Sequence, residues 1–313
     1  MYQVKRISRN EFVPIRNLNY HVRLWGEPAP GVAPLVLVHG WMDVAASYQF
    51  VVDAFSAAFA QGRCIIAPDW RGFGLTRWQA LESPGGAGDA DNYWFPDYLA
   101  DLDLLLDHYA PGQPVDLLGH SLGGNVVMHY AGVRPERIRR LINLEGFGMP
   151  ASRPAQAPAR YARWMDELKR LHRGELALKA YPEVTGVARR LMKTNPRLDQ
   201  DKADWLAKHW AKPNAQGQWE ILGDAAHKIT NATLNHVDET LEIYARISAP
   251  TLFVQAGGDS LSQWWAGKFT LDEFHERLRK VPHLTTGVIQ DAGHMLHHDQ
   301  PEELAQLIEN FVA

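Results

Sequence analysis

Short apolar runs alternate with longer amphipathic stretches along most of the chain. The run Leu-Val-Leu-Val at residues 35–38 is continuously apolar, as in a strand buried on both faces. Residues 95–109 place leucines on one side at helical spacing, which predicts an amphipathic helix. Similar runs predict strands at residues 3–7, 20–25, 63–67, 115–118, 141–144, 251–255 and 287–290. Helical spacing predicts helices at residues 44–60, directly after Ser121, at 271–280 and at 302–311.

The repeated order of strand then helix predicts an α/β fold, with a mostly parallel sheet and helices on both faces. The first two strands are expected to form an antiparallel edge. Between residues 149 and 249 the alternation of strands and helices is interrupted, and helical patterns occur without a convincing strand run. We therefore expect a core of residues 1–149 and 249–313, and an all-helical cap of residues 150–248 inserted after the sixth strand. The helical patterns of the cap lie at residues 159–172, 187–192, 199–210 and 237–247.

Composition narrows the class of protein. The 313 residues carry 32 basic and 36 acidic side chains, a net charge of −4, without a run of like charges that would bind nucleic acid or anionic lipid. No apolar leader and no stretch of 18 apolar residues is present, so we expect a cytoplasmic protein without a membrane segment. The single cysteine, Cys64, lies in a strand-like run and is expected to be structural. The small, polar residues 79–91 predict a surface loop, with a mobile lid as the alternative.

One motif carries nucleophile chemistry. Gly119-His120-Ser121-Leu122-Gly123 follows a predicted strand and opens a predicted helix, which is the setting of a nucleophile elbow. The glycines leave room for a sharp turn that holds Ser121 in a strained conformation. The alternative is an ordinary serine at a helix N-terminus. An earlier strand ends in His39-Gly40-Trp41, which favours the nucleophile elbow over the ordinary helix N-terminus.

With these motifs the sequence resembles the α/β-hydrolase superfamily. Within the expected cap, a further set of residues resembles the cap of the serine hydrolase-like branch: Tyr181-Pro182, Met192-Lys193-Thr194-Asn195-Pro196, Trp219, Asp224 and His227-Lys228. The resemblance to the superfamily covers the core and implies the α/β-hydrolase fold. It also implies an oxyanion hole formed by the backbone N–H groups of Trp41 and Leu122. His294, just after the last strand, is the implied general base.

The residue that orients His294 has more than one candidate. Asp259 follows a strand in Ala256-Gly257-Gly258-Asp259 and resembles the acid of the family, so Asp259 is the expected partner and completes the order Ser, Asp, His. Glu145, at the end of another strand, is the alternative that some branches use. Asp116 lies inside a strand and is a poor candidate.

Metal chemistry is the competing interpretation of the histidines. His297 and His298 have ligand spacing relative to His294, but no carboxylate or cysteine cluster matches them in sequence. We therefore expect no metal site and no cofactor.

Apolar residues near the ends of the strands predict a pocket for an apolar or aromatic substrate. The pocket candidates are His39, Gly40, His120, Phe147, Met149, Trp264, Trp265 and Met295.

The sequence thus predicts a serine hydrolase that cleaves small to medium apolar carboxylic esters through an acyl-enzyme. Hydrolysis of a lactone, an amide or a carbon–carbon bond, or acyl transfer, remains open at the same site. A non-catalytic ligand-binding or interaction protein with this fold is the alternative from another class. The expected partner is a small-molecule ester, and both a monomer and a homodimer fit the sequence.

Overall fold

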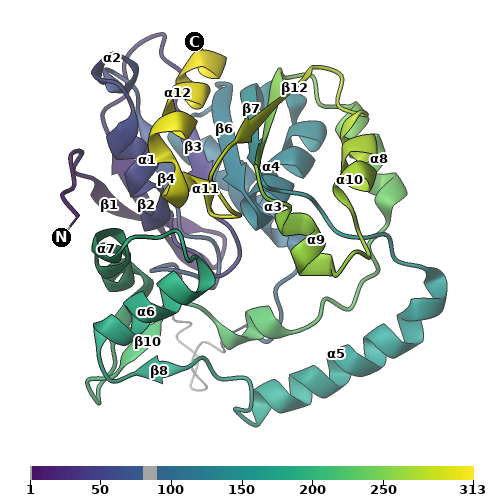
Figure 1. The fold of residues 1–313 in the computed structure, drawn as a ribbon. Helices are drawn as coiled ribbons and strands as arrows, with labels where there is room; N and C mark the ends of the chain where they lie inside the picture. Colours follow the sequence, from purple (N-terminus) through teal and green to yellow (C-terminus); the bar gives the residue numbers. More distant parts are fainter. Residues whose placement is uncertain (1, 80–89) are drawn as a thin grey trace.

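A nine-stranded sheet forms the centre of the computed structural model, which describes residues 2–79 and 90–313 (Figure 1). The strand order is β1-β2-β4-β3-β6-β7-β11-β12, with the short β5 paired to β2. From β4 to β12 all neighbouring strands are parallel, whereas β1, β2 and β4 pair antiparallel. The strands are β1 (Arg9–Ile15), β2 (Leu18–Trp25), β3 (Leu35–Val38), β4 (Ile65–Pro68), β5 (Arg77–Trp78), β6 (Val115–His120), β7 (Ile138–Leu144), β11 (Thr251–Ala256) and β12 (Leu284–Ile289).

Helices cover both faces of the sheet and bury two apolar layers. One layer includes side chains of α3, α4, α8 and α10, and the other includes side chains of α1, α11 and α12. Within the described residues, no helix has the length and apolar character needed to cross a membrane. The core helices are α1 (Gln49–Ala54), α2 (Ala57–Ala60), α3 (Phe95–Tyr109), α4 (Leu122–Val133), α8 (Val237–Ala245), α9 (Ser260–Trp265), α10 (Leu271–Leu278), α11 (Leu296–Asp299) and α12 (Pro301–Val312).

The predicted α/β architecture is confirmed, but two local predictions are wrong. Residues 3–7 do not form a strand: the backbone N–H groups of Lys5 and Arg6 instead donate to the carboxylate of Asp53. The expected helix over residues 44–60 is divided into a 3₁₀ turn, α1 and α2. Ser56 begins α2 by accepting a hydrogen bond from the Phe59 N–H, which explains the second break. Residues 80–89 of the expected loop lie outside the described residues.

The predicted all-helical cap of residues 150–248 is wrong in two respects. Its last helix, α8, packs against α4 of the core, where a Cβ on Gly132 would lie 2.1 Å from the Ile243 carbonyl oxygen. The rest of the inserted segment is not all-helical. It contains α5 (Ala157–His172), α6 (Val184–Thr194), α7 (Gln200–Trp210) and a small antiparallel sheet of β8 (Ala180–Tyr181), β10 (Trp219–Ile221) and β9 (Ala211–Pro213). These strands have two or three residues each, too few for the sequence to show an alternating pattern. The insertion follows the sixth strand of the main sheet when the two-residue β5 is set aside. In Figure 1, α5 extends away from the sheet.

A short stretch of the insertion is anchored to the core by hydrogen bonds and by ring stacking. The Asp224 N–H donates to the Gly72 carbonyl, and the Tyr93 hydroxyl donates to the Asp224 carboxylate. The His227 ring stacks between Phe73 and Tyr93, with ring centroids 3.8 and 3.7 Å away. Burial between these rings lowers the pKa of His227 to about 3.

His227 should therefore make folding sensitive to acid. An unfolded histidine binds a proton below about pH 6.5, whereas His227 in the folded protein does so only near pH 3, so this contribution to stability is lost progressively as pH falls between these values. In His227→Gln, we expect the free energy of unfolding to fall less steeply from pH 6 to 4, by up to about 1.4 kcal/mol per pH unit. Urea unfolding at several pH values measures this slope. The exposed His283→Gln is the control, and parallel curves for His227→Gln and the wild type would contradict the prediction.

Candidate active site

Ser121 lies in a strained turn between β6 and α4. Its backbone has φ 53° and ψ −114°, a conformation that residues other than glycine rarely adopt. The neighbouring glycines make the turn possible, since a Cβ on Gly119 would lie 2.2 Å from the Gly123 carbonyl oxygen. A Cβ on Gly123 would lie 2.3 Å from the carbonyl oxygen of Val38 at the end of β3. The nucleophile-elbow geometry expected from the sequence is thus present.

His294 faces the Ser121 hydroxyl. Its Nε2 lies 2.9 Å from Ser121 Oγ, within hydrogen-bond distance. Ser121 and His294 are both partly exposed to solvent. His294 lies in the loop between β12 and α11, where the sequence predicts it.

Glu145, and not Asp259, contacts the other nitrogen of His294. Glu145 follows β7, has a positive φ of 55° and is buried. One of its carboxylate oxygens lies 3.1 Å from His294 Nδ1 and also accepts the Ser260 hydroxyl; the other accepts the Ala256 N–H at 2.7 Å. A carboxylate can only accept, so Nδ1 carries the proton toward Glu145 and Nε2 is free to accept the proton of Ser121.

The expectation that Asp259 orients His294 is therefore contradicted. Asp259 is exposed and caps α9, where its carboxylate accepts the N–H and hydroxyl of Ser262. Its position after β11 resembles that of a family acid, but its side chain caps the helix that starts at Ser260 and does not face His294. Instead, Ser260 itself binds Glu145. The strand end at Glu145 was the signal in the sequence that could have indicated this pairing.

The loop after β3 lies against Ser121. A Cβ on Gly40 would be 3.0 Å from Ser121 Cβ, so the Gly40 backbone is next to the nucleophile, and Trp41 follows it in the chain. Leu122 is the first residue of α4, where backbone N–H groups have no partner within the helix. The Trp41 indole donates to the His227 carbonyl at 3.3 Å and thereby links this loop to the inserted segment.

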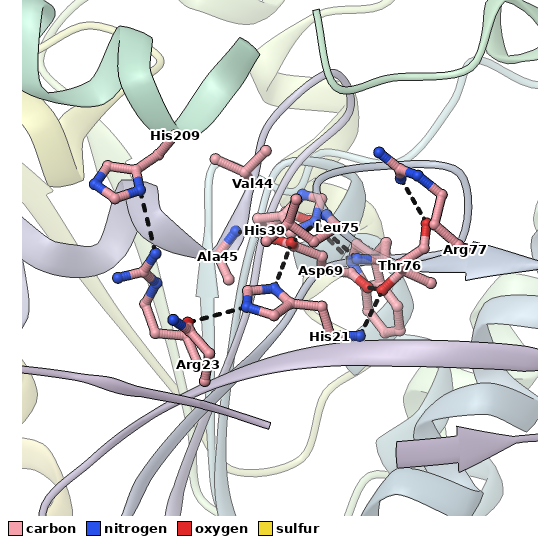
Figure 2. A network of polar contacts seen from close by, with 12 residues as sticks. His21, Arg23, His39, Val44, Ala45, Asp69, Leu75, Thr76, Arg77 and His209 are labelled. Carbon is pink, nitrogen blue, oxygen red and sulfur yellow. Dashed lines mark hydrogen bonds and ion pairs between the residues drawn. The ribbon is translucent and has the colours of Figure 1, made fainter. Parts of the chain in front are cut away.

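Buried polar contacts also fix the loop after β3 and the start of the 3₁₀ turn that follows it (Figure 2). His39 is fully buried: Nδ1 donates to the Gly40 carbonyl at 2.8 Å, and Nε2 accepts the Trp70 N–H at 2.9 Å. Asp69 accepts the Ala45 N–H at 2.7 Å and pairs with His21 at 2.7 Å. Burial alone would raise the pKa of Asp69, but the hydrogen bond from His21 and the nearby imidazoles keep it below its usual range.

Four predicted pocket residues are buried, namely His39, Gly40, His120 and Phe147. His39 holds the loop as just described. His120 donates from Nε2 to the His294 carbonyl at 2.7 Å, and burial lowers its pKa well below the usual range, so it is a neutral support for the loop of His294. Phe147 packs edge-on against Phe253 and Phe274 in the core.

The remaining pocket candidates differ in exposure. Trp264 is 60 % exposed, and its ring centroid lies 5.1 Å from that of His294. Met149 is 45 % exposed, whereas Trp265 and Met295 are partly buried. Among the exposed pocket candidates, Trp264 is thus the one whose ring lies against the candidate base.

Comparisons with known proteins show the family to which this fold belongs. The alpha/beta hydrolase fold family matches residues 33–301. The chain belongs to this family. It is 22% identical over 299 residues to a serine hydrolase-like protein of Danio rerio, covering 93% of this chain and 84% of the relative. It is 25% identical over 283 residues to a cis-3-alkyl-4-alkyloxetan-2-one decarboxylase of Shewanella oneidensis, covering 89% and 81%.

A solved structure supports the fold of this α/β hydrolase. The thioesterase domain from the curacin biosynthetic pathway superposes with a TM-score of 0.76 at 23% identity, covering 96% of this chain and 99% of that domain. The resemblance extends through the inserted segment, because nearly the whole chain is covered.

Substitution of Glu145 should slow the reaction strongly, whereas substitution of Asp259 should change it little. Glu145→Gln removes an oxygen that only accepts and allows the wrong tautomer of His294, so we expect acylation by p-nitrophenyl acetate to slow about 10²- to 10⁴-fold. Asp259→Asn keeps a good N-cap and should stay within about threefold of the wild type. Stopped-flow release of p-nitrophenol measures both. A slow Asp259→Asn with a normal Glu145→Gln would reverse the assignment.

Proposed function

We propose that this α/β hydrolase cleaves carboxylic esters through Ser121, His294 and Glu145. The observation that carries the proposal is the continuous contact from Ser121 Oγ to His294 Nε2 at 2.9 Å and from His294 Nδ1 to Glu145 at 3.1 Å. A serine hydroxyl is a weak nucleophile without a base, and an imidazole fixed in one tautomer supplies that base.

The proposed reaction has two half-reactions. His294 takes the proton of Ser121 as Oγ attacks the carbonyl carbon, and then gives a proton to the alkoxide that leaves. Water attacks the acyl-enzyme by the same route and releases the acid, which restores Ser121. Glu145 stabilises the imidazolium that forms in each step without taking its proton.

The oxyanion would be stabilised by backbone N–H groups. Leu122 at the start of α4 and Trp41 beside Ser121 are the proposed donors, and each donor of this type contributes about 3 kcal/mol to lowering the barrier. The buried contacts of His39 and Asp69 would keep the Trp41 donor fixed while charge develops.

Exposed aromatic surface supports an apolar or aromatic ester as substrate. Trp41 and Trp264 are 45 % and 60 % exposed, although large apolar side chains are usually buried. Trp41 follows Gly40 beside the nucleophile, and Trp264 lies against His294. An apolar group of the substrate would cover both rings.

A cyclic ester is a second candidate substrate. The relative from Shewanella oneidensis is named for an oxetan-2-one, which is a four-membered lactone, and it covers most of this chain. Attack of Ser121 on a lactone would use the same contacts as attack on an open ester.

A substrate panel tests the proposal. We expect p-nitrophenyl esters with apolar acyl groups to be hydrolysed more than tenfold faster than the matched anilides, with lactones as the second series. Loss of turnover in Ser121→Ala and His294→Ala assigns the activity to this site. Preference for anilides or for carbon–carbon substrates would overturn the ester proposal, and tight ligand binding without turnover would favour a binding protein.

A further inference from the structure

A second group of ionisable side chains lies behind the candidate base. Asp43 lies in the loop after β3, while His297 and His298 lie on α11, directly after the loop of His294. Their exposed fractions are 3 %, 0 % and 2 %. Such polar groups are normally hydrogen-bonded when buried, because an unpaired one costs about 1–3 kcal/mol.

Most of the donor and acceptor atoms in this group have no hydrogen-bond partner among the described residues. Both ring nitrogens of His297 and of His298 lack hydrogen bonds within the described part of the chain, and so does Asp43 Oδ2. The other oxygen of Asp43, Oδ1, accepts the Val44 N–H at 2.8 Å, the Trp210 indole at 3.1 Å and the Ser47 hydroxyl. Asp43 is therefore held firmly through one oxygen while the other faces the histidines.

The unpaired atoms converge. One ligand atom from each of Asp43, His297 and His298 lies within 4.8 Å of the others, and His297 Nε2 is 3.8 Å from Asp43 Oδ2. We propose that Asp43, His297 and His298 bind a divalent transition-metal ion of the Zn²⁺ type. Two imidazoles and one carboxylate are a common ligand set for this ion, and imidazole nitrogen excludes Mg²⁺ and Ca²⁺ as preferred occupants.

The spacing requires only small side-chain movements. Three atoms no more than 4.8 Å apart share a point within about 2.8 Å of each (4.8 Å divided by the square root of three), whereas zinc bonds to nitrogen and oxygen are about 2.0–2.2 Å. Each ligand atom would move by less than about 1 Å. The hydrogen bonds to Asp43 Oδ1 would orient the carboxylate, as outer contacts of metal ligands commonly do.

The proposed ion would brace the candidate active site. His120 packs against His297 with ring centroids 4.4 Å apart, and its Nε2 donates to the His294 carbonyl. The ion would also tie α11 to the loop after β3, which carries Trp41. The ion would act on the active site only through these contacts, since none of its three ligands contacts Ser121 in the described structure.

Metal titration of the full chain tests this site. After chelator treatment and desalting, the protein should bind one equivalent of Zn²⁺. A free Zn²⁺ concentration of about 100 times its Kd should raise the Tm of the protein by roughly 5 °C. Cobalt(II) should give the visible absorption of a site with nitrogen and oxygen ligands. X-ray absorption of the zinc-loaded wild type should show two imidazoles, which needs no variant to fold.

Variants locate the ion. Asp43→Asn and His298→Gln should weaken binding at least tenfold, while His294→Gln and the control His275→Gln should bind normally. His275 is a partly buried histidine that binds Gln255 and lies outside the group. Absence of stoichiometric binding by the wild type, fewer than two imidazoles on zinc, or binding that depends on His294 would each overturn the proposal.

Discussion

The close approach of α4 to β3 is the constraint on which the active centre depends. At Gly123 the helix lies so near the Val38 carbonyl that no side chain fits between them. This contact forces the chain to reverse sharply at Ser121, and the strain at this residue is balanced by packing on both sides. A second close contact, at Gly40, places the loop after β3 beside Ser121. These two backbone approaches thus position the nucleophile and the proposed oxyanion donors together.

Buried carboxylates fix the loops around this turn. Asp69 holds the loop after β3, and Glu145 joins the ends of β7 and β11 to the loop of His294. Each carboxylate is buried but accepts several hydrogen bonds, which compensates for its lost hydration. The proposed ion at Asp43 would act in the same way on α11. The partly exposed pair of Ser121 and His294 is therefore held by groups that solvent does not reach.

The sequence predicts the core well because its elements are set by local patterns. The apolar run at residues 35–38 and the amphipathic helix at 95–109 have observed bounds within a residue of those predicted. The partner of His294 depends on tertiary contacts: Asp259 and Glu145 both follow strands, and only the positive φ of Glu145 and the start of α9 at Ser260 separate them. The group of Asp43 with His297 and His298 joins distant parts of the chain, so no spacing rule could reveal it. Strands of two or three residues in the insertion are too short to leave a pattern.

The central claim is that Ser121 is an activated nucleophile whose base is His294. Intact-mass analysis after reaction with a fluorophosphonate tests it most directly, because phosphonylation requires an activated serine and no knowledge of the substrate. The account predicts a single adduct on the wild type and none on Ser121→Ala or His294→Ala. A folded wild type that stays unlabelled, or an adduct that persists in Ser121→Ala, would contradict it.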